Sequence, residues 1–254
     1  MLVQSATPDM TDHGGLPPSA MPVSDSVSVR ANGRVYSRVK DPKVVRAALR
    51  ANCALKRYFD LVATAVGIFF LLPFLLTIAV LIKLDDGGPI LYGHRRIGRR
   101  GAIFTCWKFR TMVRNSDQAL KNYLEANPAA LEEWRETQKL QKDPRITRVG
   151  KFLRDYSLDE LPQLFNILRG EMSLVGPRPV TRSELNERYR KDRRYYLLVR
   201  PGLTGLWQVS GRNNLTYARR VKLDEQYLRE WSFGSDFSIL LRTVDVVLKR
   251  DGAY

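Results

Sequence analysis

The chain has 254 residues, two cysteines, two histidines and a formal net charge of +16. This length accommodates one sizeable domain with appendages. Cys53 and Cys106 form no CxxC pair, which argues against a zinc site or a disulfide framework and fits a reducing compartment. His13 lies near the N-terminus and His94 in a basic run. A histidine-based triad is therefore not expected, although His94 stays open as a single catalytic residue.

The positive charge favours an anionic partner, namely nucleic acid, anionic lipid or a phosphorylated substrate. The cations are concentrated between Gly87 and Ser116, a stretch that contains no acid. A solvated basic face would also explain such a run. The neighbouring segments are therefore needed to distinguish this explanation from an anionic partner.

Residues 1–45 are rich in proline, serine, glycine and small polar residues. We expect them to form a disordered tail. They do not resemble a signal peptide, because no basic region is followed by a continuous apolar run.

Residues 61–82, "LVATAVGIFFLLPFLLTIAVLI", carry no charge. As a straight helix they would be roughly 33 Å long, which matches the hydrocarbon thickness of a bilayer. A buried core helix is the alternative, but uncharged runs of this length are rare in soluble domains. The segment therefore predicts a membrane helix.

Basic residues flank this segment on both sides, and positive residues favour the cytoplasmic side of a membrane. Pro73 lies near the middle, where it removes one helical hydrogen bond. We expect a re-entrant helix that enters one leaflet, breaks at Pro73 and returns. A proline-kinked helix that spans the bilayer is the alternative.

The remaining pattern predicts an α-rich α+β fold with a small β-hairpin. The β-prone runs 90–97 and 102–109 enclose the turn "GRRG". Residues 116–141 read as one polar helix, and 217–231 and 236–250 as amphipathic helices. The last helix combines apolar residues with cations, so it could lie on an anionic membrane surface or face the core.

The most informative stretch is "SLDELPQLFNILRGEMSLVGPRP", residues 157–179. Asp159 and Glu160 have a structural explanation, because Ser157 followed by Glu160 matches a capping box and acids suit a helix N-terminus. Pro162 is tolerated only near a helix start, which predicts a helix beginning within 157–162.

The same two carboxylates also have a chemical interpretation. One could attack phosphorus while the other holds a metal. An anionic nucleophile that attacks an anionic phosphate needs charge cancellation, from Mg²⁺ or from cations such as Arg154 and Arg178.

Three blocks in order decide between these interpretations: "KFRTM" (108–112), the stretch 157–179, and "RPGLTGLWQVSGRN" (200–213). They resemble the signature blocks of the bacterial sugar transferases, the monotopic phosphoglycosyl transferases. From about residue 56 to the C-terminus the chain is similar to the short form of this family, close to exopolysaccharide-initiating galactose or glucose transferases.

The resemblance implies transfer of a sugar phosphate from a UDP-sugar to undecaprenyl phosphate, with Mg²⁺ and with release of UMP. Asp159 would be the nucleophile that forms a phosphosugar-aspartyl intermediate. Glu160 would bind or orient the metal together with Asp159. A homodimer is compatible with the family, and no nucleic-acid partner is expected.

The resemblance also assigns a group of residues to binding of the substrate phosphates and the nucleotide. These residues are Arg154, Pro177, Arg178, Lys108 and Arg110.

One position departs from the family pattern. Many members break the membrane helix at a Ser-Pro pair, whereas this chain has Leu72-Pro73. Thr77 is the nearby residue that could supply a hydroxyl instead.

The expected organisation is a disordered tail at 1–45, a membrane-embedded re-entrant segment at 46–84 and a catalytic domain at 85–254. The resemblance places the protein in the bacterial inner membrane, with amphipathic interfacial helices and the catalytic domain on the cytoplasmic face. Two alternatives remain. A non-catalytic basic adapter would bind anionic lipid or nucleic acid, and a phosphatase would release free phosphate.

Overall fold

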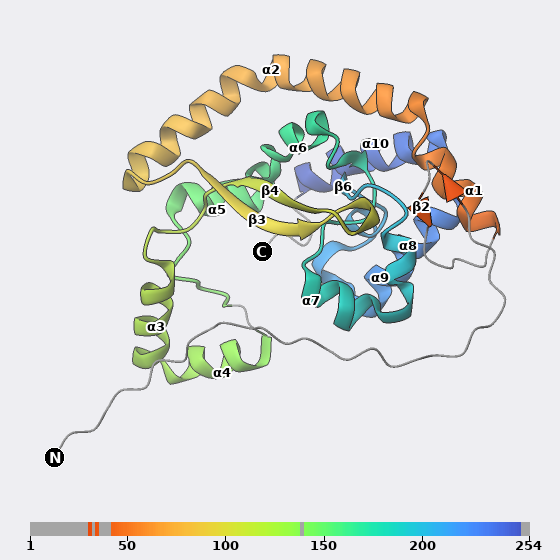
Figure 1. Cartoon of the computed structure of the whole chain (residues 1–254). Coiled ribbons are helices and arrows are strands. Elements are labelled where there is room, and N and C mark those ends of the chain that lie inside the picture. The colour runs from red at the N-terminus through yellow and green to blue at the C-terminus, as the bar shows by residue number, and fades with distance from the viewer. Residues whose placement is uncertain (1–29, 32–33, 36–41, 138–139, 250–254) are drawn as a thin grey trace.

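A computed structural model describes residues 30–31, 34–35, 42–137 and 140–249 (Figure 1). The expected tail at 1–45 lies mostly outside these residues. Within it the structure describes the short antiparallel strands β1 (Arg30–Ala31) and β2 (Arg34–Val35) and the beginning of helix α1 (Pro42–Ala51). Val44 of α1 has an exposed fraction of 0%, so α1 packs with the folded domain.

The described chain is mostly helical, which confirms the predicted α-rich class. The next elements after α1 are α2 (Ala54–Asp86), β3 (Leu91–Ile97), β4 (Ile103–Phe109), α3 (Ser116–Ala126), α4 (Pro128–Thr137), α5 (Arg148–Asp155) and α6 (Gln163–Arg169). The C-terminal part contains β5 (Ser173–Val175), α7 (Arg182–Glu184), α8 (Arg193–Tyr196), β6 (Gly202–Thr204), α9 (Tyr217–Arg229) and α10 (Phe233–Lys249).

The predicted hairpin is confirmed. β3 and β4 pair antiparallel, with Tyr92 opposite Lys108 and Ile97 opposite Ile103. β5 and β6 form a separate parallel pair. Gly202 allows their close approach, because a Cβ there would collide with the backbone of Gly176. This crossing brings the segment "GPRP" beside the segment "RPGLTG".

The polar helix expected at 116–141 is two helices, α3 and α4. The physical reason is Pro128, which opens α4 and cannot continue the hydrogen bonding of α3. Asn127, the residue before it, has φ −133° and ψ 92°, the extended conformation that a following proline imposes. Residues 138–139 lie outside the described chain.

Helix α2 is continuous over 33 residues. The helix is therefore not interrupted at Pro73, where a break was expected. Figure 1 shows α2 as a bent arc above the rest of the fold. Proline removes one hydrogen bond, and the neighbouring bonds are enough to continue the helix with a bend. The Thr77 hydroxyl donates to the Pro73 carbonyl at 2.9 Å.

The apolar window of α2 has a mean hydropathy of 2.8 and is only 17% buried, so the helix is long and apolar enough to cross a membrane. Its inner face packs on the fold, where Leu75, Ile78 and Ile82 contact Phe109 and Leu153. The outer face carries exposed large apolar side chains: Leu55, Tyr58, Val62, Val66, Phe69, Phe70, Leu72, Phe74, Leu76, Val80, Leu81 and Leu84.

The amphipathic helices expected near the C-terminus are confirmed as α9 and α10. α10 has two faces. Ile239 belongs to the core cluster that also contains Val44 and Tyr227. Phe237, Leu241 and other apolar residues of the opposite face are exposed.

Candidate active site

The pair Asp159–Glu160 lies in a single 3-10 turn, Leu158–Glu160, just before α6. Ser157 precedes it in the left-handed conformation (φ 55°, ψ 21°) and its side chain makes no capping hydrogen bond. The capping box suggested by the sequence is therefore wrong. A serine in this conformation costs free energy, and such strain is typical of functional sites.

The turn is fixed against the hairpin by a buried amide. Asn166 of α6 has an exposed fraction of 0%. Its Oδ1 accepts from the backbone N–H of Trp107 at 3.1 Å, and its Nδ2 donates to the carbonyl of Thr105 at 2.8 Å. These bonds tie α6 to β4, so the adjacent acids lie over the strand that carries Lys108.

Lys108 reaches both carboxylates. Its Nζ lies 2.7 Å from Glu160 Oε1 and 3.5 Å from Asp159 Oδ2. Arg178, in the loop after β5, donates from Nη2 to the same Glu160 oxygen at 3.1 Å. The side chains of Asp159 and Glu160 are 13% and 15% exposed, so these contacts form in a largely dry site.

The cations do not act equally on the two acids. Burial alone would raise the pKa of Glu160, but Arg178 and Lys108 outweigh it and lower the pKa to about 2. Burial raises the pKa of the Asp159 carboxyl, Lys108 opposes this, and the charge of Glu160 adds to the rise. The net pKa of Asp159 is higher than usual, although Arg154 and Arg178 also lower it. A carboxylate with a raised pKa is the more basic and more nucleophilic of the two.

Thr111 of the "KFRTM" block holds Arg154 in place. The Nε of Arg154 donates to the hydroxyl of Thr111 at 2.8 Å. α5 approaches Thr111 so closely that a Cβ on Gly150 would collide with the Thr111 carbonyl. Arg154 is thereby near enough to Asp159 for their charges to interact. The sequence did not identify Thr111 as the residue that orients Arg154.

The other two expected binding residues lie differently. The carbonyl of Pro177, which is buried, accepts from the N–H of Gly202 at 2.8 Å. Pro177 thus fixes the backbone next to Arg178. Arg110 forms an ion pair with Asp86 at the end of α2, and its guanidinium lies against Gly88, where a Cβ would require the Arg110 side chain to shift. Arg110 therefore anchors the C-terminal end of α2 in this structure.

The acid pair fits Mg²⁺ by its donor chemistry. Mg²⁺ in phosphate-transferring sites is ordinarily held by one or two carboxylates together with substrate phosphates. The Lys108 ammonium group contacts both acids, which shows that a cation is stabilised between them. Among the described residues, no group of three or more His, Cys, Asp or Glu side chains gathers as a metal site, so substrate and water would complete the ligand set.

A buried ion network joins the beginning of α2 to the domain. Lys56 was expected only as part of a basic flank, yet its Nζ lies 2.6 Å from Asp236 Oδ2 and 3.6 Å from Asp60 Oδ1. Tyr227 donates to Asp236 at 2.9 Å, and Ser173 donates to Asp60 at 2.7 Å. Only the i,i+4 spacing of Lys56 and Asp60 hinted at this network in the sequence.

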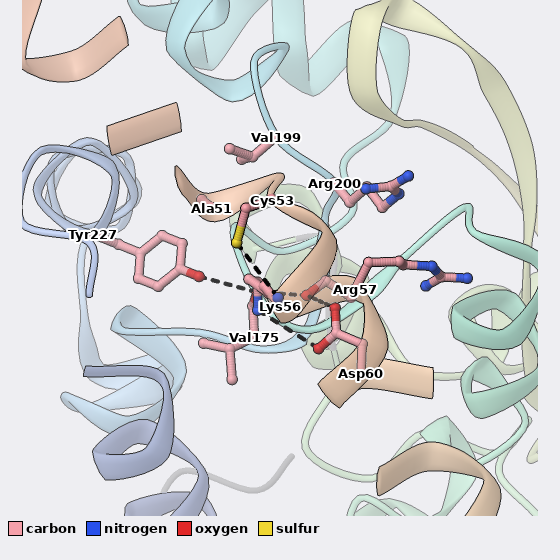
Figure 2. Close-up of a pocket in the computed structure, with 10 residues that line it drawn as sticks. Ala51, Cys53, Lys56, Arg57, Asp60, Val175, Val199, Arg200 and Tyr227 are labelled. Carbon is pink, nitrogen blue, oxygen red and sulfur yellow. Dashed lines mark hydrogen bonds and ion pairs between the residues drawn. The ribbon is translucent and has the colours of Figure 1, made fainter. Parts of the chain in front are cut away.

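A small pocket borders this network (Figure 2). Figure 2 shows the side chains of Arg57 and Arg200 pointing away from Lys56 and Asp60. Their guanidinium groups donate to the carbonyls of Leu168 (3.2 Å) and Gly170 (2.8 Å) at the C-terminal end of α6. These two arginines therefore satisfy a helix terminus.

Comparisons with known proteins agree with this architecture. Residues 51–250 match the family model described as "Bacterial sugar transferase". The UDP-galactose-lipid carrier transferase of Erwinia amylovora is 56% identical over 200 residues, which make up 79% of this chain and 42% of that protein. The undecaprenyl-phosphate galactose phosphotransferase of Salmonella typhimurium is 51% identical over 207 residues, 82% of this chain and 43% of that protein.

A third relative has a similar length. The exopolysaccharide production protein ExoY of Sinorhizobium fredii is 53% identical over 199 residues, 78% of this chain and 88% of that protein. The apolar helix α2 is long enough to cross a membrane, and these matches define the class of protein by its family. The chain belongs to the bacterial sugar transferase family. It spans less than half the length of the Erwinia and Salmonella relatives.

Proposed function

We propose that this protein transfers a sugar 1-phosphate from a UDP-sugar to undecaprenyl phosphate and releases UMP, as the first step of exopolysaccharide or related glycoconjugate synthesis. The observation that carries the proposal is the pair Asp159–Glu160, which is enclosed by cations on a fold attached to an apolar helix. The relatives named for galactose transfer to a lipid carrier support UDP-galactose as the donor, with UDP-glucose as the alternative.

The proposed reaction has two displacements at one phosphorus atom. Asp159 attacks the β-phosphorus of the donor, the bond from this phosphorus to the bridging oxygen breaks, and UMP leaves with the electron pair. The resulting acyl phosphate carries the sugar. An oxygen of undecaprenyl phosphate then attacks the same phosphorus and the Asp159 carboxylate leaves. The raised pKa of Asp159, caused chiefly by burial, supports its assignment as the nucleophile.

The neighbouring residues have separate tasks in this scheme. Lys108, Arg178 and Arg154 offset the phosphate charge while the aspartyl bond forms. Glu160 holds Lys108 and Arg178 in place through its two short contacts. Bound Mg²⁺, held by Asp159 and Glu160, would supply further charge neutralisation for the diphosphate.

The attachment of α2 supports a re-entrant arrangement. Its first turn is tied to the domain by Lys56 and Asp236, and its last turn by Asp86 and Arg110. A helix that crosses a bilayer places its ends on opposite sides, whereas both ends of α2 bind the same domain. We infer that α2 is embedded in one leaflet, with the domain on the cytoplasmic face of the inner membrane.

The exposed apolar face of α10 supports the same orientation. Phe237, Leu241, Val244 and Leu248 recur at helical spacing and are more than half exposed. An amphipathic helix of this kind suits the headgroup region of a bilayer. In this arrangement α10 lies in the membrane interface, beside the beginning of α2.

The proposal is tested with the purified full chain in detergent, Mg²⁺ and undecaprenyl phosphate. UMP release from UDP-galactose or UDP-glucose, with a sugar-diphosphate lipid as the second product, would support it. Release of inorganic phosphate without a lipid product would indicate a phosphatase instead. Binding to anionic vesicles without release of UMP from either donor would indicate a non-catalytic adapter.

A further inference from the structure

A second arginine accompanies Arg178 at the edge of the candidate active site. The Cζ atom of Arg178 lies 5.8 Å from the ring centroid of Trp207, and that of Arg220 lies 4.7 Å from the same centroid. We call these three residues the Trp207 cluster. Sequence reasoning missed Arg220, because it lies outside the three family-like blocks and nothing local distinguishes it from the other cations of α9.

The cluster is built as a rigid platform. Trp207 has an exposed fraction of only 5%, so its indole ring is a fixed support for the guanidinium groups. Arg220 donates from Nε to the carbonyl of Leu215 at 3.2 Å, and Arg178 donates to Glu160 at 3.1 Å. Contacts of this kind set the planes of both groups before a ligand arrives, which is the condition for directed phosphate binding.

The two guanidinium groups of the cluster repel each other. Burial lowers the pKa of Arg220, and the charge of Arg178 lowers it further. Glu184 opposes this effect, but it already accepts from Arg96 at 2.8 Å. A bound anion would relieve the repulsion between the two guanidinium groups.

The two distances to Trp207 limit how far apart the guanidinium groups can be. Their separation cannot exceed the sum of those distances, so both groups can contact neighbouring phosphates of one ligand. Arg178 also contacts Glu160, the neighbour of Asp159. The cluster therefore continues from the reacting carboxylate to a second phosphate position.

The position of α9 separates the two phosphate-bearing substrates. Figure 1 shows α9 on the side of the fold away from the middle of α2. A lipid acceptor has to reach the site from the side of the membrane helix, whereas a soluble nucleotide can approach from the side of α9. The geometry points to Arg220 as a binding residue for the nucleotide phosphate of the donor, the phosphate that leaves with UMP. This inference rests on the proposed function.

The experiment measures nucleotide binding without turnover. UMP and uridine are titrated into the full chain in detergent, for Arg220→Met and for Arg229→Met as the control. Arg229 belongs to the same helix and also lies over an aromatic ring, that of Tyr195 at 5.7 Å, but its side chain is 42% exposed and pairs with Glu225. Arg220→Met should weaken UMP binding roughly ten-fold or more, and Arg229→Met should leave it unchanged.

Further comparisons separate the explanations. Uridine lacks the phosphate, so its affinity should be the same in Arg220→Met and wild type, and Arg220→Lys should recover part of the UMP affinity. Unchanged UMP binding in a folded Arg220→Met would overturn the inference, as would an equal loss for uridine and UMP. Weaker binding of a short polyprenyl phosphate, with UMP unaffected, would assign Arg220 to the acceptor and also overturn it. If the wild type bound no uridine nucleotide, the proposed function itself would fail.

Discussion

Asp159 and Glu160 are adjacent in the sequence but have opposite electrostatic surroundings. Lys108 and Arg178 lower the pKa of Glu160 to about 2, overcoming its burial. Burial dominates at Asp159 and raises its pKa. Two carboxyl groups whose pKa values are pushed apart commonly have different chemical tasks. The pair is therefore better described as one nucleophile and one charge-holding neighbour than as two equivalent metal ligands.

Substitution of each acid by its amide tests this division. Asp159→Asn should lower transferase activity by roughly a thousand-fold or more, because an amide cannot form the acyl phosphate. Glu160→Gln should lower it by roughly ten- to hundred-fold, since Lys108 and Arg178 lose their charged acceptor. Asp159→Asn should keep a near-normal melting temperature, because the amide retains the shape of the carboxylate side chain. Wild-type activity in Asp159→Asn would remove this residue from the mechanism.

Lys108 should set the acid limit of activity. Asp159 has to be ionised to attack, so the rate falls as the pH drops through its pKa. Lys108 lowers that pKa while burial raises it, and Lys108→Met therefore raises it further. The acid limb of the kcat profile should move to higher pH in this variant. An acid limb at the wild-type pH would show that Lys108 does not act on the titrating group.

At the scale of elements, the sequence predicted what depends on local pattern. The β-prone runs around "GRRG" predicted the hairpin, and the amphipathic pattern predicted α9 and α10. The capping box failed because Lys108 and Arg178 engage Glu160 from 52 and 18 residues away. Contacts between residues so far apart in the chain produce no periodic pattern in the sequence. Pro128 indicated the division between α3 and α4, but the polar pattern continues on both sides of it, so a single helix was predicted.

The attachment of α2 gives a prediction about stability. Lys56 is buried between Asp60 and Asp236, so Lys56→Met leaves two buried carboxylates without their cation. The free energy of unfolding should fall by about 3–5 kcal/mol. Lys83→Met is the matched control near the other end of α2, because exposed Lys83 only donates to the carbonyl of Gly87, and it should cost about 0.5 kcal/mol or less. Equal unfolding midpoints for the two variants would refute the anchoring role of Lys56.

At the scale of the whole molecule, the two anchored ends of α2 predict its topology. Cys53 and Cys106 are replaced by alanine, and single cysteines are placed at Arg50 in α1 and Lys121 in α3, both of which are exposed. A membrane-impermeant maleimide should label both positions in inside-out vesicles and neither in right-side-out vesicles. Labelling of the two positions from opposite sides would establish a spanning helix.

The sequence located the centre of the site but not its supports. Asp159, Glu160, Lys108 and Arg178 were expected together, and the structure brings them together. Their supports, such as Asn166, come from long-range contacts that no single segment reveals. Motif blocks identify the candidate reactive and binding residues. The residues that position them are determined by the packing between the blocks.

The most direct test of the covalent mechanism omits the lipid acceptor. Enzyme mixed with the UDP-sugar and Mg²⁺ alone should release UMP in a burst of roughly one equivalent or less, because each Asp159 can accept one phosphosugar. Intact mass and peptide mapping at low pH should find the phosphosugar on Asp159, and Asp159→Asn should show neither burst nor adduct. If UMP appears only after polyprenyl phosphate is added and the kinetics require a ternary complex, the lipid phosphate attacks the donor directly and Asp159 is not the nucleophile.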